Sequence, residues 1–250
     1  MKKILIITIA LMASFSAGAQ QLYNMSFDTW YKDGGVWCLY PAKAGDDFRV
    51  WDSVNRGVKM LGVCLAEPEY EHVAVPGNGK AAVKLSSHKF AGGYIPANLF
   101  TGRYVRTVKL SGIEMYNGVP FTGRPVSLSG YYHYAPGTID CVKDPYKSKK
   151  GQQDNAYIEI ALYTWDEPLH MITTDGPAPD PEKDPKLVGR AVLRITKATD
   201  GYVHFEMPIQ YRSAAVPTYI GISITPSAWG EFLTGSSKSV LYVDELKFNY

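Results

Sequence analysis

The residues of this chain that could do binding chemistry are aromatic and polar side chains that alternate with apolar ones in two stretches, 123–137 and 157–165. In an extended strand, such alternation places the two kinds of side chain on opposite faces. If the two strands are neighbours in one sheet, their faces that point away from the core form one concave surface. We predict that six residues line this surface as a ligand-binding site: Tyr131, His133, Tyr157, Glu159, Tyr163 and Trp165.

The chemistry that these residues suit is the recognition of sugars. A sugar ring presents a flat patch of C–H groups beside hydroxyl groups, so a protein that binds it in water needs exposed aromatic faces next to polar groups. Arg194, His204 and Glu206 could join the site from adjacent strands. Two alternatives stay open. The rings could pack under loops, or the sugar could bind at the loop ends, where a second set of rings lies: Trp37, Tyr40, Trp51, Tyr70 and Trp229.

Hydrolysis of a glycosidic bond is a further alternative, because Glu159 and Glu206 both point away from the core in the predicted strands. A glycosidase needs two carboxyl groups roughly 5 to 9.5 Å apart across the bond that it cleaves. The plainer interpretation is that these glutamates are solvated residues on strands. The sequence holds no GxSxG, HExxH or P-loop motif, and its five histidines lack the spacing of metal ligands.

The elements that must position these side chains are short strands. Roughly eight to ten strands with turn signals between them, and no helix longer than a turn or two, predict an all-β jelly-roll β-sandwich. A proline-rich stretch over residues 175–185 is expected to be an exposed loop, since its prolines lack backbone donors. Besides the two stretches named above, strands or strand edges are expected over residues 22–30, 81–85, 190–195, 202–207, 219–224 and 239–250.

The first residues have the pattern of an export signal. Lys2 and Lys3 precede an apolar run over residues 4–12, which leads to small residues suited to cleavage. We predict a signal peptide over residues 1–19, a single domain over residues 20–250, and a secreted or periplasmic protein. The apolar run is too short to cross a bilayer, and no later segment reaches the roughly 18 apolar residues that a membrane helix needs.

The charge of the chain disfavours two classes of partner. There are 26 lysines and arginines against 24 aspartates and glutamates, and removal of Lys2 and Lys3 with the predicted signal peptide leaves 24 of each. A formally neutral chain lacks the electrostatic footprint of a protein that binds nucleic acid or an anionic membrane.

The chain has three cysteines: Cys38, Cys64 and Cys141. Because three is an odd number, at most one internal disulfide can form if the protein is exported to an oxidising compartment. A bond between Cys38 and Cys64 would staple the loop-rich first third of the chain. Three separate buried thiols are the equal alternative. The spacing of the cysteines matches no zinc site.

Four segments carry a resemblance to a known family. They are SFDTW (26–30), GGYIPANLFTGRY (92–104), GVPFTGRPVSLSGYYHYAPG (118–137) and GSSKSVLYVDELKF (235–248). In this order they resemble the putative carbohydrate metabolism domain (PCMD), found in exported proteins of glycan-degrading gut bacteria. The resemblance implies a jelly-roll sandwich similar to carbohydrate-binding modules, and an exported accessory protein of carbohydrate binding or metabolism.

A jelly-roll sandwich of this kind suggests a structural calcium ion and, besides carbohydrate, a protein partner. Asp28 and Asp244, in the expected first and last strands, could contribute to a structural calcium site, although two carboxylates do not specify one. The plainer interpretation of Asp244 is a turn or edge carboxylate. We predict no other cofactor. The aromatic surface would also suit a protein partner in an assembly of the cell envelope.

Overall fold

The computed structural model describes residues 19–42, 49–109, 112–174 and 178–250. The predicted signal peptide falls almost wholly on residues 1–18, which lie outside the described residues. Within the described part of the chain, no helix is long and apolar enough to cross a membrane.

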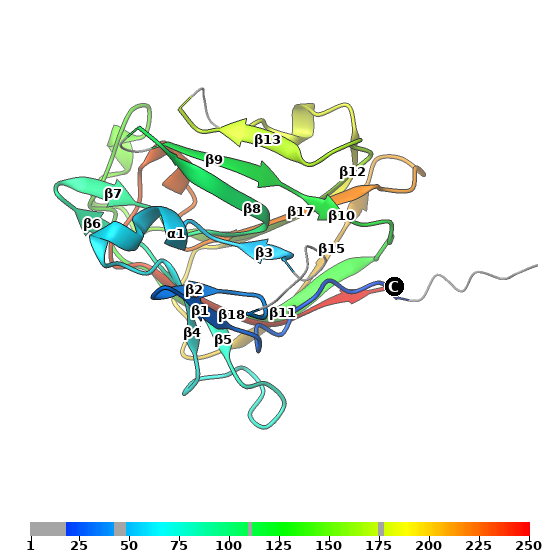
Figure 1. Ribbon diagram of the computed structural model, residues 1–250, viewed down its shortest axis with the longest axis horizontal. Helices are drawn as coiled ribbons and strands as arrows, with labels where there is room; N and C mark the ends of the chain where they lie inside the picture. The colour runs from blue at the N-terminus through cyan, green and yellow to red at the C-terminus, as the bar shows by residue number, and fades with distance from the viewer. Residues whose placement is uncertain (1–18, 43–48, 110–111, 175–177) are drawn as a thin grey trace, which may run out of the picture.

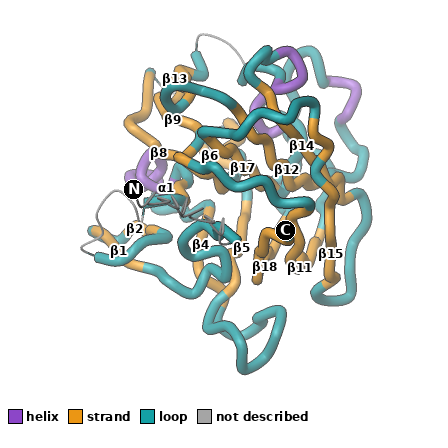
Figure 2. The backbone as a smooth tube through the Cα atoms, turned by 90° about the vertical axis from the view of Figure 1, so that its right-hand side faces the viewer, coloured by secondary structure: helices purple, strands orange, loops and turns teal. Residues whose placement is uncertain are grey.

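Two antiparallel sheets form two layers (Figures 1 and 2). The smaller sheet has five strands. In spatial order they are β15 (Val203–Pro208), β11 (Ser127–Ala135), β18 (Val240–Asn249), β5 (Ala82–Ser86) and β4 (Ala66–Glu69).

The larger sheet has nine strands, seven of which follow one another in space. Two more lie off this path: β3 (Trp51–Asp52) pairs with the third of the seven, and β10 (Val119–Pro120) pairs with the fourth. The seven are, in order, β13 (Leu169–Ile172), β9 (Gly112–Asn117), β8 (Leu99–Val108), β17 (Tyr219–Thr225), β12 (Ala156–Tyr163), β14 (Leu187–Ile195) and β16 (Gln210–Tyr211).

Strand β8 pairs with the central part of the larger sheet only at its start. It pairs with β17 through Leu99 and Phe100, whereas from Gly102 onward it pairs with β9, which in turn pairs with β13. The later part of β8, with β9 and β13, therefore forms a three-stranded extension of the sheet, which we call the arm (Figure 1).

The remaining elements are short, as the sequence indicates. Two hairpins join β1 (Tyr31–Asp33) to β2 (Val36–Cys38) and β6 (His88–Phe90) to β7 (Gly93–Ile95). The helical segments of the described residues are α1 (Asn55–Val58), η2 (Lys59–Leu61), η3 (Lys147–Lys149), η4 (Pro181–Lys183) and η5 (Gly230–Phe232).

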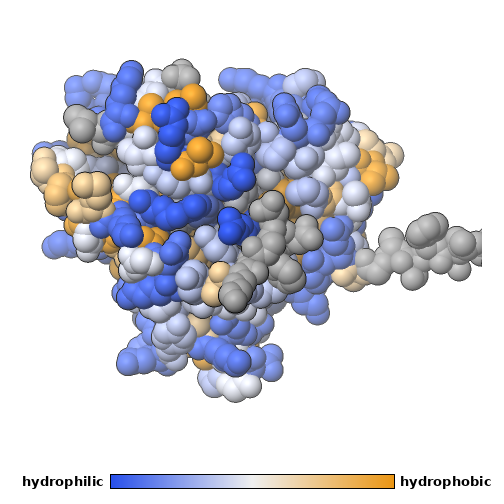
Figure 3. Space-filling view, viewed as in Figure 1, coloured by the Kyte–Doolittle hydropathy of each residue, from blue (hydrophilic) through white to orange (hydrophobic). Residues whose placement is uncertain are grey.

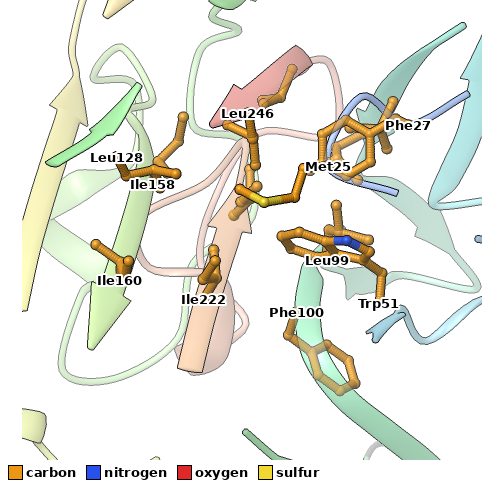
Figure 4. Packing of buried hydrophobic residues seen from close by; sticks show 14 of the residues in the cluster. Met25, Phe27, Trp51, Leu99, Phe100, Leu128, Ile158, Ile160, Ile222 and Leu246 are labelled. Carbon is orange, nitrogen blue, oxygen red and sulfur yellow. The ribbon is translucent and has the colours of Figure 1, made fainter. Parts of the chain in front are cut away.

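A hydrophobic core joins the two sheets (Figure 4). The smaller sheet contributes Leu128 and Phe248, and the larger sheet contributes Ile158, Ile160 and Ile222, all of which are buried. These residues occupy alternate positions of their strands, as period-two alternation predicts. The prediction of an all-β sandwich is confirmed.

The segment 22–30 is not a strand, contrary to the prediction. Asn24 and Phe27 adopt left-handed backbone conformations, with φ of 57° and 55°, which turn the chain twice within four residues. The turns bury Phe27 against Trp51, with 5.3 Å between ring centroids. Phe27 and Trp30, the aromatic residues that suggested a strand, instead pack in and against the core as part of an irregular segment.

A buried carboxylate holds together the loops at one end of the sandwich. The Oδ2 atom of Asp154 accepts hydrogen bonds from Ser227 Oγ (2.5 Å), Ser236 N (2.7 Å) and Ser239 Oγ (3.0 Å). Its Oδ1 atom accepts one from Asn155 N at 2.9 Å. Because Asp154 is fully buried, these bonds are shielded from water and tie the start of β12 to the loop around η5.

Replacement of Asp154 should therefore destabilise the fold. In Asp154→Ala several buried donors lose their acceptor, and we expect the free energy of unfolding to fall by roughly 3 kcal/mol. Urea denaturation followed by tryptophan fluorescence measures this change. Asp200→Ala, at an exposed aspartate, is the matched control and should change stability by less than about 0.5 kcal/mol. Equal effects of the two substitutions would contradict the role assigned to Asp154.

Candidate functional site

The two stretches predicted to form one binding surface lie in different sheets, β11 in the smaller and β12 in the larger. Each strand buries its aliphatic residues in the shared core, so the alternate residues point outward on opposite sides of the sandwich. Tyr131 and His133 face one side, and Tyr157 and Glu159 face the other. The prediction of one shared surface is wrong, because the chain crosses between sheets after β11 instead of forming a hairpin.

Two of the predicted ligand-binding rings are buried. Tyr163 and Trp165 are 5% and 8% exposed, and they stack on each other with ring centroids 3.7 Å apart and planes 11° from parallel. Trp165 Nε1 donates a hydrogen bond to Asp184 Oδ2 at 2.8 Å. The ring faces are used within the protein, so the alternative that rings pack under loops holds for these two.

Tyr157 lines a groove of about 1080 Å³ on the outer side of the larger sheet. Ser223 from β17 lies in the groove as well, and the arm contributes residues of β8, β9 and β13. Further lining comes from two loop regions, residues 89–97 and 227–233. Ligand pockets in proteins typically have volumes of roughly 300 to 1,000 Å³. The groove is thus large enough to be a candidate ligand site.

An apolar surface adjoins one end of this groove. Phe90 on β6, which also lines the groove, is 45% exposed. Figure 3 shows apolar side chains gathered at the left edge of the molecule, where Figure 1 places β6 and β7. An exposed aromatic ring beside a groove is a feature of surfaces that bind ligands.

Two amide groups in the groove have unused hydrogen-bonding capacity. The Oδ1 atoms of Asn98 and Asn117 are buried, and neither has a hydrogen-bond partner among the residues that the structure describes. A buried acceptor without a donor costs about 1 to 3 kcal/mol. Both residues line the groove, where the hydroxyl group of a ligand could supply the missing donor.

Charged groups around Tyr157 shape the electrostatics of the groove. Burial, and then the charge of Glu159, raises the pKa of Tyr157 to about 12, so its hydroxyl stays protonated. Glu159 is held by Arg190, whose Nε atom lies 2.6 Å from Glu159 Oε1. Burial also raises the pKa of Glu231, the charge of Glu159 raises it further, and a hydrogen bond from the Ala178 backbone opposes the shift.

The predicted catalytic pair is not a pair in the structure. Glu159 lies on β12 of the larger sheet and Glu206 on β15 of the smaller sheet, so the core separates them and they cannot act on one bond. Glu159 is not among the residues that line the groove. The carboxyl group that does line it is that of Glu231, in η5, whose pKa the charge of Glu159 helps to raise. No sequence motif marks Glu231, because only the folding of its loop over the larger sheet brings it there.

The outer side of the smaller sheet holds the other predicted residues. Tyr131 lines a second hollow, of about 720 Å³, together with His204 and Glu206. His133 lies outside this hollow: its Nδ1 atom is 2.8 Å from Thr199 Oγ1, and its ring stacks on Tyr242 at 5.4 Å.

The remaining candidates divide between buried and exposed positions. Arg194 is exposed on β14. Among the loop rings, Trp51 and Tyr40 are buried and cannot contact a ligand, whereas Tyr70 is 57% exposed. Trp229 packs near Tyr146, with 6.3 Å between ring centroids. Trp37 packs edge-to-face on Trp30 at a centroid distance of 6.3 Å.

Asp28 and Asp244 lie near each other, but their oxygen atoms already accept hydrogen bonds, one from the Ser26 hydroxyl to Asp28 Oδ2 and the others from the backbone. Asp28 Oδ1 accepts from the N–H groups of Lys80 and Ala81, and the two Asp244 oxygens accept from those of Ala74 and Glu245. Calcium needs six to eight oxygen ligands. Within the described residues, no cluster of three or more metal-binding side chains occurs. We therefore interpret the two carboxylates as hydrogen-bond acceptors that hold the loop 70–81 in place, rather than as calcium ligands.

The cysteines form no disulfide. Cys38, Cys64 and Cys141 are all free thiols, and Cys38 is buried. Burial raises the pKa of Cys64 to about 11, so its thiol stays protonated at neutral pH. Of the two alternatives drawn from the sequence, three separate thiols is the one that the structure supports, but only Cys38 is buried, whereas Cys64 and Cys141 are half-buried.

Comparison with known proteins agrees with this architecture. The two packed antiparallel sheets define the class, an all-β sandwich. The chain belongs to the putative carbohydrate metabolism domain family, whose model matches residues 26–249. The resemblance seen in the sequence is thereby confirmed. No curated protein sequence matches the chain.

Two solved structures share the fold. A putative glycoside hydrolase from Bacteroides thetaiotaomicron is 21% identical, with a TM-score of 0.67, and the match covers 90% of this chain and 70% of that one. A putative glycoside hydrolase from Bacteroides vulgatus is 18% identical, with a TM-score of 0.61, and the match covers 85% and 90% of the two chains. At these identities the likeness establishes the fold and leaves the activity open.

The buried carboxyl group of Asp244 should make stability depend on pH. Burial raises its pKa from the ordinary 3.8 to about 6, against the opposing effect of its backbone hydrogen bonds. The folded state therefore binds the proton more tightly than the unfolded chain. We expect this group to add stability as the pH falls from about 7 to about 4, by roughly 2 kcal/mol.

Carbon-detected NMR titration of Asp244 measures its pKa directly, and urea denaturation at pH 7 and pH 4.5 measures the stability. Asp244→Asn should remove this part of the pH dependence. A titration midpoint near 4 would contradict the effect of burial.

Proposed function

We propose that this protein is an exported carbohydrate-binding accessory protein that holds a glycan in the groove of the larger sheet. Membership in a carbohydrate-related family supports the class of ligand. The observation that carries the proposal is the pair of buried, unbonded amide oxygens of Asn98 and Asn117 in a groove that also contains Tyr157.

Recognition would combine two kinds of contact. Hydroxyl groups of the sugar donate hydrogen bonds to the amide oxygens of Asn98 and Asn117, which removes the cost of leaving these acceptors unpaired. The rings of Tyr157 and Phe90 contact the C–H patches of the sugar. The groove, of about 1080 Å³ and lined by residues from β6 to the arm, offers room for more than one sugar unit.

Substitutions in the groove should weaken glycan binding. We expect Asn117→Ala and Tyr157→Ala each to reduce affinity about tenfold, since each removes a contact of about 1 to 2 kcal/mol. Affinity electrophoresis in gels that contain soluble polysaccharides, followed by calorimetry on the best ligand, measures the change. Val216→Ala, which shortens an exposed side chain outside the groove, is the control. Unchanged affinity in both groove variants would rule out this site.

Glycoside hydrolysis at the same groove is a second candidate function, which the position of Glu231 favours. Glu231 lines the groove, and its raised pKa suits a proton donor, while Glu159 on the larger sheet is ion-paired with Arg190. A proton donor and a second carboxyl group are the two groups that glycosidases use.

Release of new reducing ends from a glycan panel separates the two functions. A hydrolase would release them, and Glu231→Gln would abolish release while retaining binding. Protein that retains glycan without releasing reducing ends is a binder. Capture of a protein partner with no glycan binding would instead favour the envelope-assembly alternative.

A further inference from the structure

The hollow on the smaller sheet is separate from the groove and lies on the opposite side of the sandwich. We infer that it is a second saccharide site, selective for neutral sugars, so that one protein can hold two glycan chains at once. Only the class of ligand rests on the proposed function. The site itself follows from the shape, polar groups and charge of the hollow.

The hollow exists because the smaller sheet is bulged at this point. Ser129 pairs with Lys247 but Tyr131 pairs with Asp244, so β18 contains one residue more than β11 over the same span. The extra residue places Glu245 in the left-handed region, with φ of 49°. Such bulges re-aim side chains and are common beside functional sites, and a left-handed glutamate is an uncommon, strained conformation.

A glycine on the partner strand allows the bulge to close. A Cβ atom at Gly130 would lie 2.7 Å from Leu246 Cδ2 and 3.2 Å from the Asp244 carbonyl oxygen. Leu246 is buried in the core and forms part of the floor of the hollow, which its neighbours Glu245 and Lys247 also line. The dent in the sheet is thus built by two specific features, a bulge in β18 and a glycine in β11.

The polar groups of the hollow are held in place by one another. Asn249 Nδ2 lies 2.9 Å from Ser127 Oγ, 3.1 Å from Ser129 Oγ and 3.3 Å from Glu206 Oε1. Ser127 Oγ donates a second hydrogen bond to Glu206 Oε1 at 2.5 Å. A carboxylate fixed in this way is ordered before a ligand arrives, which lowers the entropic cost of binding.

An aromatic ring lies beside this polar network. Tyr131 is half-buried and packs edge-to-face with His204, with 5.1 Å between ring centroids. Asn78 and Val75 complete the rim from the loop 70–81. A ring next to fixed acceptors and donors is the combination that sugar recognition needs.

The rim is anchored at both ends of its loop. Tyr202 donates a hydrogen bond to the carbonyl oxygen of His72 at 2.9 Å, and Ala74 N donates to Asp244 Oδ2 at 2.8 Å. Asp28 Oδ1 accepts from Ala81 N at 3.0 Å. The loop is therefore a fixed wall of the hollow.

The charge of the hollow selects among saccharides. Glu206 and Glu245 line it, against one lysine, Lys247, and Asp28 lies close to Glu245. The excess of carboxylates repels uronic acids and sulfated sugars, so neutral sugars fit best.

Calorimetry on neutral oligosaccharides of glucose, galactose, mannose, xylose and arabinose tests the inference. With the best ligand we expect wild-type protein to bind two molecules, and Tyr131→Ala and Tyr157→Ala to bind one each. Val216→Ala, at an exposed residue that lines neither the groove nor the hollow, should still bind two. His204→Ala is a second variant at the hollow in case Tyr131→Ala does not fold, and circular dichroism checks both. An oligosaccharide of galacturonic acid should show at least tenfold weaker binding at the hollow.

A bridging assay reads out the two sites together. Wild-type protein bound to an insoluble neutral polysaccharide should capture a soluble fluorescent oligosaccharide, and either single variant should lose this capture. If wild type binds one molecule and Tyr131→Ala changes nothing, the second site is overturned and the groove remains. If Tyr157→Ala changes nothing while Tyr131→Ala abolishes binding, the groove fails and the hollow remains. If no oligosaccharide binds, both fail.

Discussion

The two faces of every long strand impose the constraint on which the rest of this structure depends. One face must enter the core that joins the sheets, so the other must point outward on the side of its own sheet. Tyr131 and Tyr157 obey this rule in opposite directions, because β11 and β12 belong to different sheets. The positions of the two candidate surfaces, on opposite sides of the sandwich, therefore follow from the packing of the core and not from any feature of the surfaces themselves.

The irregular parts of the chain then decide what each outer side offers. On the larger sheet, the arm and the loop around η5 surround a groove, and the buried carboxylate of Asp154 ties that loop to the start of β12. On the smaller sheet, a bulge at Glu245 dents the surface, and Asp28 and Asp244 hold the loop above it. Buried carboxylates thus serve as anchors for the loops beside both candidate sites.

Membership in a carbohydrate-related family leaves open whether the protein binds or cleaves glycan, and the structure narrows where to look. The buried amide oxygens of Asn98 and Asn117, which lack a hydrogen-bond partner among the described residues, favour the binding of a ligand in the groove. Glu231, which lines the groove and whose raised pKa suits a proton donor, is the feature that favours hydrolysis there. A binder with sites on two sides would link glycan chains, whereas a hydrolase would need only the groove.

The sequence by itself determined the all-β class, the core positions of β11 and β12, and the family, because alternation along a strand and local motifs are properties of neighbouring residues. It did not determine which strands pair. Alternation shows which face of its strand a side chain occupies, but not which sheet the strand joins. For this reason Tyr131 and Glu159 were predicted to lie on one surface, whereas the structure places them on opposite sides. Only the tertiary structure brought Asn98, Asn117 and Glu231 to one groove and buried Trp165, since these contacts join segments far apart in the chain.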